Sequence, residues 1–194
     1  MTEMTEQHRN TSTAPGHAVQ RAACAALAVA TAAGLGLAGA GAAQALGESQ
    51  ASTPTCTTSG LTASFGQKLG GGMSHEGVVL KLKNTSGHSC ALRGYPGLGL
   101  EDSKHRTLGS SVHWGDTWYA KDPGKKTLTL KKNQSAEAVI AWTHANAGTS
   151  GARHATYLQV TPPANTAHKT LKLPTWVDHG RLSVTALAPN IHIG

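Results

Sequence analysis

The feature that most constrains this chain is a series of short apolar alternations, broken by turn residues, that follows residue 55. In "GVVLKLKN" (77–84), every second residue from Val78 to Leu82 is apolar, and Lys81 and Lys83 take alternate positions. Successive side chains of a strand point to opposite faces, so the pattern predicts a half-buried strand. No segment keeps a sustained helical period. We therefore expect a fold built from strands.

Similar alternations recur along the rest of the chain, with a turn signal about every 8–12 residues. Such spacing is typical of an all-β fold, and we predict an immunoglobulin-like antiparallel β-sandwich with one disulfide, preceded by a signal peptide. The expected strands are 61–65, 77–84, 89–93, 98–102, 106–112, 127–130, 135–142, 156–161, 170–174 and 181–188.

The first 45 residues have the three-part pattern of a secretory signal peptide. A polar leader with Arg9 and Arg21 precedes an uncharged, alanine-rich run, which ends in "AQA" at Ala43–Ala45. We predict a signal peptide over 1–45, a short linker over 46–55 and a β-sandwich domain over 56–194. The alternative is a retained membrane anchor, since about 20 apolar residues can span a bilayer.

Cleavage after Ala45 would remove Cys24 and leave two cysteines, Cys56 and Cys90. The count suits one bridge with no free thiol in an oxidising compartment. Cys90 shares a strand face with Leu92, so its side chain should point into the core and tie the start of the domain to this hairpin. A bridge closing about 35 residues is worth about 3–4 kcal/mol in the chain-entropy model.

Four segments carry a resemblance to a known family: "CTTSGLTASFG", "LKNTSGHSCALRGYPGLGLED", "LTLKKNQSAEAVIAWT" and "YLQVTPP". Over about residues 56–188 the chain resembles an actinobacterial exported domain of unknown function, family 4232. The resemblance implies a secreted or surface-tethered β-sandwich with Cys56 and Cys90 as its paired cysteines. It implies no activity.

Residues that would carry catalysis or bind metal are sparse. The chain has no nucleophile elbow, P-loop, His-Glu-x-x-His or dinucleotide fingerprint. The histidines lack ligand spacing; only His113 with Asp116, or Asp178 with His179, could join a site assembled by folding. We assign Glu101 to a solvated turn, and expect neither enzymatic activity, nor a metal site, nor a cofactor. The sequon at Asn84 is equally explained by a tight hairpin.

An aromatic stretch, "VHWGDTWYAKDPG" (112–124), crowds Trp114, Trp118 and Tyr119 among turn residues. Aromatic side chains on a loop make good binding anchors, and indole faces could stack on the sugar rings of a cell-wall polymer. The alternative, which we favour from the sequence, is that Trp114 and Trp118 fold inward and plug one end of the sandwich.

A cluster of lysines follows and brackets one predicted strand. A positive edge of this kind would attract anionic envelope polymers. The favoured alternative is that lysine on an edge strand prevents sheet-to-sheet aggregation. No nucleic-acid module accompanies the lysines, so nucleic acid is not expected as a partner. The cluster comprises Lys121, Lys125, Lys126, Lys131 and Lys132.

Together these features predict a non-catalytic, exported or cell-envelope-associated binding module, secreted or at the extracellular cell surface. Its ligand would be a cell-wall saccharide or an anionic polymer, and it would keep no membrane span after cleavage. The leader's two arginines and two glutamates cancel, so the remainder retains the net charge of +7. An accessory domain that docks a protein partner along a sheet edge or loop is the second hypothesis, and an extracellular hydrolase is a remote third.

Overall fold

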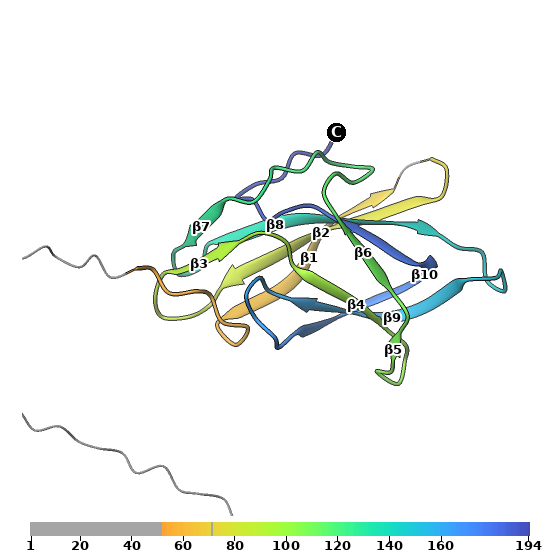
Figure 1. Cartoon of the computed structure of the whole chain (residues 1–194), viewed down its shortest axis with the longest axis horizontal. Helices are drawn as coiled ribbons and strands as arrows, with labels where there is room; N and C mark the ends of the chain where they lie inside the picture. Colours follow the sequence, from red (N-terminus) through yellow and green to blue (C-terminus); the bar gives the residue numbers. More distant parts are fainter. Residues whose placement is uncertain (1–51, 71) are drawn as a thin grey trace, which may run out of the picture. The chain divides into compact units, whose positions relative to one another are not determined.

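The structure is a computed structural model that describes residues 52–70 and 72–194 (Figure 1). The predicted signal peptide (1–45) and most of the predicted linker lie outside the described residues. The described part of the chain is all-β and contains no helix. It accordingly holds no helical segment of the length and apolarity needed to cross a membrane.

Ten strands form the domain, close to the number that the alternations predict. They are β1 (Leu61–Gly70), β2 (His75–Asn84), β3 (Cys90–Arg93), β4 (Gly97–Glu101), β5 (Thr107–Leu108), β6 (Ser111–Trp114), β7 (Thr127–Leu130), β8 (Ser135–His144), β9 (Ala152–Thr161) and β10 (Lys169–Val184).

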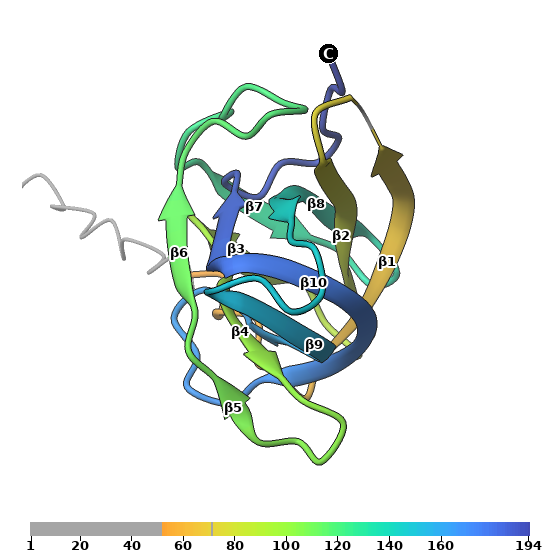
Figure 2. The same ribbon diagram turned by 90° about the vertical axis from the view of Figure 1, so that its right-hand side faces the viewer.

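Eight of the strands belong to one curled sheet. Its order is β1-β2-β8-β10-β9-β4-β5, and every neighbouring pair along this path is antiparallel. β6 lies off this path and pairs with β10 in parallel. β3 and β7 form a separate antiparallel ribbon. Figure 2 shows how the curved β10 connects the β1-β2-β8 side to the β9-β4-β5 side.

β10 replaces two strands that the sequence predicts separately, at 170–174 and 181–188. Its first half pairs with β9 and its last residues pair with β8 and β6, with a register shift between Val177 and Leu182. His179 and Gly180 have positive φ angles of 50° and 65°, so the strand bends between the two pairings. The prediction of a break was wrong because the chain turns here without leaving the sheet.

The strand expected at 106–112 is divided into β5 and β6, because these two pieces pair with different strands. Between them, the backbone of Gly109 passes very close to the bend in β10. A Cβ atom at Gly180 would lie 2.2 Å from the Gly109 carbonyl oxygen. Gly180 therefore permits both the positive φ and this close approach.

The main core lies between the curled sheet and the β3–β7 ribbon. Leu80, Leu82, Ile140 and Leu158 of the curled sheet are fully buried, as is Leu92 of the ribbon. As predicted, a Cys56–Cys90 disulfide lies in this core, and both cysteines are buried. It links the start of the domain to β3.

A second, smaller core covers the other face of β2 and β8. Leu69, Val79, Val139 and Ala141 form its floor, and Tyr119 from the loop after β6 packs on top of them. This cover explains why β2 buries Val79, although the alternation places Val79 on the same face as the lysines. The loop containing Tyr119 is thus held at a fixed position on the sheet.

Candidate functional site

The loop that follows β6, residues 115–124, begins at Gly115, whose φ of 145° suits glycine. Asp116 closes the loop: its carboxylate accepts hydrogen bonds from the Asp122 backbone N–H at 2.8 Å and from Lys121 Nζ at 2.8 Å. These two contacts, the backbone one foremost, lower the pKa of Asp116. The loop is therefore shaped by its own polar groups before any ligand arrives.

Trp114, the last residue of β6, presents an exposed indole beside this loop. Its side chain is 56% exposed and lies parallel to the Tyr95 ring, with centroids 5.5 Å apart and 4° between the planes. Lys125 Nζ lies 5.5 Å from the Tyr95 centroid and 6.0 Å from the Trp114 centroid. We call Tyr95, Trp114 and Lys125 the Trp114 platform.

The hydroxyl of Tyr95 is held by the carboxylate of Asp122. This hydroxyl donates to Asp122 Oδ2 at 2.6 Å, and Asp122 Oδ1 accepts from the Ala186 backbone N–H at 2.7 Å. The hydrogen bond to Asp122 is the main cause of a raised pKa at Tyr95, with burial contributing. Asp122 thus joins the platform to the segment after β10.

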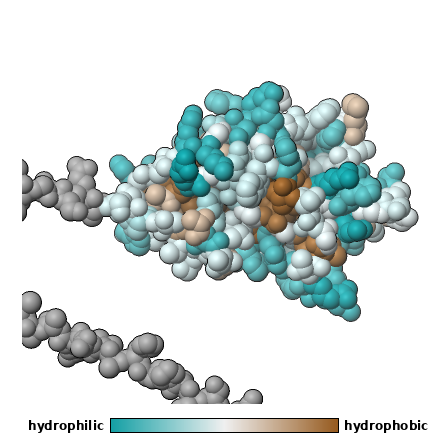
Figure 3. All heavy atoms as spheres, viewed as in Figure 1, coloured by the Kyte–Doolittle hydropathy of each residue, from teal (hydrophilic) through white to brown (hydrophobic). Residues whose placement is uncertain are grey.

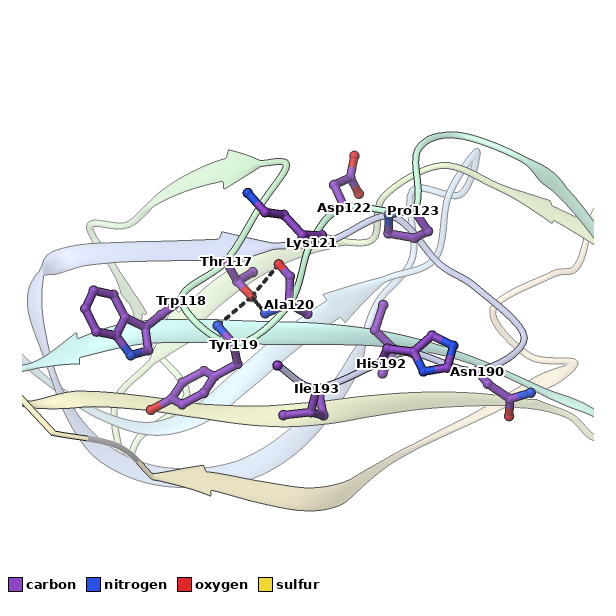
Figure 4. Close-up of a pocket in the computed structure, with 12 residues that line it drawn as sticks. Thr117, Trp118, Tyr119, Ala120, Lys121, Asp122, Pro123, Asn190, His192 and Ile193 are labelled. Atoms are coloured by element: carbon purple, nitrogen blue, oxygen red, sulfur yellow. Dashed lines mark hydrogen bonds between the residues drawn. The ribbon is translucent and has the colours of Figure 1, made fainter.

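Trp118, within the loop, forms a second exposed aromatic group. It is 57% exposed and stacks on His75 of β2, with ring centroids 3.8 Å apart and 17° between the planes. It also borders a pocket of about 480 Å³ between the loop and the C-terminal residues 190–194. Figure 4 shows the Trp118 ring at one end of this pocket, with His192 toward the other.

Tyr119 is the aromatic residue of this segment that packs into the second core. It is only 7% exposed, and its hydroxyl donates to the His75 carbonyl at 2.6 Å. Burial, and next the charge of Glu76, raise the pKa of Tyr119. The favoured sequence interpretation, in which Trp114 and Trp118 fold inward, is wrong: Tyr119 takes the inward position, and the two tryptophans that precede it are exposed.

The five lysines do not form one uniform edge. Lys121 pairs with Asp116, which raises the pKa of Lys121, and Lys125 belongs to the Trp114 platform. The other three, Lys126, Lys131 and Lys132, are exposed and make no ion pair within the described residues. The cluster therefore divides between the aromatic loop and the two ends of β7.

The residue pairs singled out from the sequence have different outcomes. Asp178 and His179 do meet, with 2.8 Å between Oδ1 and Nδ1. Asp116 is instead hydrogen-bonded to Lys121 and to the Asp122 backbone, and no hydrogen bond or ion pair joins it to His113 in the described part of the chain. Within residues 52–70 and 72–194, no group of three or more His, Cys, Asp or Glu side chains is arranged to hold a metal ion.

Glu101 is buried, which corrects its assignment to a solvated turn. His105 Nδ1 donates to its carboxylate at 2.9 Å, and Gln159 donates to the other oxygen. These hydrogen bonds, that of His105 foremost, lower the pKa of Glu101. Strand alternation could not reveal this, because both donors come from outside β4.

Asn84, the asparagine of the sequon, is fully buried. Its amide donates to the carbonyls of His88 and Leu130 at 2.9 and 2.8 Å, and its oxygen accepts from Ser86. The hairpin explanation of this motif is thus sufficient, since the side chain is occupied in holding the turn against β7.

Sequence reasoning missed Tyr95, which lies between the strands expected at 89–93 and 98–102. No local signal identifies Tyr95 as a partner of Trp114, because the two residues meet only through folding. On the face seen in Figure 3, apolar residues form small separate groups among hydrophilic ones.

These observations define the class of the molecule as a disulfide-linked, all-β domain with a preformed aromatic and basic surface. Residues 56–188 match the family described as "Domain of unknown function (DUF4232)", and the chain belongs to this family. The match confirms the family indicated by the sequence motifs. No curated protein and no solved structure matches the chain.

Proposed function

We propose that this protein is a non-catalytic, exported or cell-envelope-associated binding module whose ligand is an acidic saccharide. The observation that carries the proposal is the Trp114 platform: an indole more than half exposed, stacked on Tyr95, with the Lys125 ammonium beside both rings.

The platform offers complementary contacts to a sugar ring that bears a carboxylate or phosphate. The free indole face provides a large rigid apolar area for the C–H groups of a pyranose. The ammonium of Lys125 can form a charge-assisted hydrogen bond with an anionic substituent on the same or the next ring. A neutral sugar would use only the first contact and should bind more weakly.

The rigidity of the site favours binding over a role for these side chains in folding. Tyr95 is fixed by Asp122, and the loop is closed by Asp116, so little conformational freedom remains to be lost on association. Trp118 offers a second stacking surface on the same loop, held by His75. A polymer could engage both tryptophans in succession.

The carboxylates near the platform support a non-catalytic role. Asp116 is occupied by Lys121 and a backbone N–H, and Asp122 by Tyr95 and another backbone N–H. A glycosidase instead needs two carboxyl groups available to the scissile bond. The remote hypothesis of a hydrolase would return if turnover of a polysaccharide depended on either aspartate.

We infer further that the domain is an immunoglobulin-like sandwich and that it reaches its site of action through a cleaved signal peptide. The curl of the main sheet around one core supports the first inference, and the disulfide, which suits an extracellular location, supports the second. Protein recovered from the culture medium should begin at Leu46. Uncleaved protein confined to the cells would contradict export.

The binding proposal is tested by calorimetric titration with a panel of soluble oligosaccharides of matched length, either neutral or bearing uronate or phosphate groups. We expect acidic members to bind best, Trp114→Ala to abolish binding, and Lys125→Ala to remove the preference for acidic over neutral members. Lys126→Ala is the matched control and should behave like the parent. Binding that is insensitive to Trp114→Ala would refute the proposal.

A further inference from the structure

β7 has one free edge, and its direction follows from contacts on the far side of β3. Both backbone groups of Ala91 bond to the segment that precedes β1: its N–H donates to the Pro54 carbonyl, and its carbonyl accepts from the Cys56 N–H. The backbone groups of adjacent residues in a strand point to opposite sides, so Cys90 and Leu92 direct theirs toward β7.

The register then fixes the orientation of β7. Cys90 lies opposite Leu130, and Leu92 lies opposite Leu128, so these leucines direct their N–H and carbonyl groups toward β3. The N–H and carbonyl groups of Thr127 and Thr129 therefore point outward. No other strand pairs with β7 within the described residues.

A groove runs along this free edge. It has a volume of about 560 Å³ and is lined by all four residues of β7, by Gln134 and Ser135, and by Pro189 and Asn190. The side chains of Thr127 and Thr129 are exposed, whereas Leu128 and Leu130 point into the core. The groove thus presents two uncharged threonine side chains, together with the outward N–H and carbonyl groups of Thr127 and Thr129.

Positive charge stands at both ends of the strand. Lys126 precedes β7, and Lys131 and Lys132 follow it; all three are exposed and lack an ion pair in the described part of the chain. A lysine that protects an edge from pairing would serve best within the strand. Here the lysines flank the strand and leave its pairing groups open.

From this arrangement we propose that β7 receives an extended, acidic segment of a partner protein, which adds as a strand to the β3–β7 ribbon. The backbone groups of Thr127 and Thr129 supply the pairing, as in other cases of strand addition. The flanking lysines select carboxylate side chains at the two ends of the added strand. This surface shares no residue with the Trp114 platform, so each proposal can fail alone.

The test uses a capped, fluorescent peptide of alternating Glu and Val residues, with a Lys–Val peptide of equal length as the charge control. Fluorescence anisotropy should show binding of the acidic peptide only. Thr129→Pro removes the outward N–H and leaves the bonds to β3, since proline is tolerated at the free side of an edge strand. We expect this variant to weaken binding at least about tenfold, because it also obstructs close approach of the added strand.

Thr129→Val is the matched control, because it keeps the backbone N–H and should bind as the parent does. If Thr129→Pro fails to fold, Lys131→Glu with Lys132→Glu provides a second test and should abolish binding. Amide NMR shifts should be largest at Thr127 and Thr129. Absence of binding, equal binding of both peptides, or shifts confined to other residues would overturn the proposal.

Discussion

Trp142 and Trp114 lie in the same domain and show two different uses of one side chain. Trp142, in β8, is 7% exposed, and its Nε1–H donates to Glu76 and Thr175 at 3.0 and 3.2 Å. Trp114 is 56% exposed and contacts Tyr95 by stacking. The buried indole has both its faces and its polar atom occupied by the protein, whereas the exposed indole keeps a face available. Burial therefore assigns the first to stability and leaves the second accessible for the binding that we propose.

The largest expected effect comes from removing the buried member of this comparison. Trp142→Ala should lower the free energy of unfolding by about 3–5 kcal/mol, because it leaves a large cavity and removes the donor to Glu76. Urea denaturation measures the loss. Trp114→Ala should change stability by no more than about 0.5 kcal/mol, as is usual for a surface substitution. Equal losses in the two variants would break the comparison.

The disulfide, like Trp142, belongs to the buried core and should affect stability but not binding. Replacing both Cys56 and Cys90 by alanine should cost about 2–5 kcal/mol, because the unfolded chain regains the freedom of a loop of about 35 residues. Thermal unfolding with and without reductant provides the measurement. Saccharide binding of the folded variant should be unchanged, since the Trp114 platform lies outside the loop. An unaltered melting temperature after reduction would show that the bridge contributes nothing.

Asn84 is a buried polar residue, and we expect it to stabilise the fold through its hydrogen bonds. Asn84→Ala should cost about 1–3 kcal/mol, because the carbonyls of His88 and Leu130 lose their amide donor. Since Leu130 is in β7, hydrogen exchange at the β3–β7 ribbon should accelerate in the variant. Unchanged exchange at these amides would contradict this role for Asn84.

Glu101 gives the smallest effect, and it depends on pH. Its lowered pKa in the folded protein means that it contributes stability above the usual glutamate pKa of about 4.3, and that this contribution is lost as the pH falls through the lowered value. Glu101→Gln should therefore lose less stability than the parent between neutral pH and pH ~3. Asp102 and Asp116, whose pKa values are also lowered, remain in both proteins. The difference between the acid denaturation curves of the parent and the variant therefore reports the contribution of Glu101 to stability. Parallel curves would show that Glu101 contributes no pH-dependent stability.

Period-two patterning was sufficient for the parts of the fold where burial alternates regularly. It predicted the strand at 127–130 with the observed bounds, and it oriented Cys90 toward the core. It failed at β10, where a bend held by Gly180 continues the strand through residues that look like a turn. Local pattern contains no information on which distant strand a segment will join.

The candidate site was predicted only in part for the same reason. Aromatic crowding at 112–124 indicated the correct segment, but a turn-rich sequence has no period from which to infer that Tyr119 points inward while its neighbour Trp118 points outward. Tyr95 could not be found, because its contact with Trp114 is made by two segments brought together by folding. The count of lysines between 121 and 132 likewise suggested one positive edge, whereas the fold divides them between the aromatic loop and the two ends of β7.

Ligand recognition at the Trp114 platform can be measured directly by an NMR titration of the four tryptophan indole N–H signals with an acidic oligosaccharide. We expect a saturable shift of the Trp114 signal, a smaller shift at Trp118 and none at Trp142, with all shifts absent in Trp114→Ala. Binding that moves Trp142 and leaves Trp114 unchanged, or no shift of any indole signal, would contradict the assignment of the exposed platform to ligand recognition.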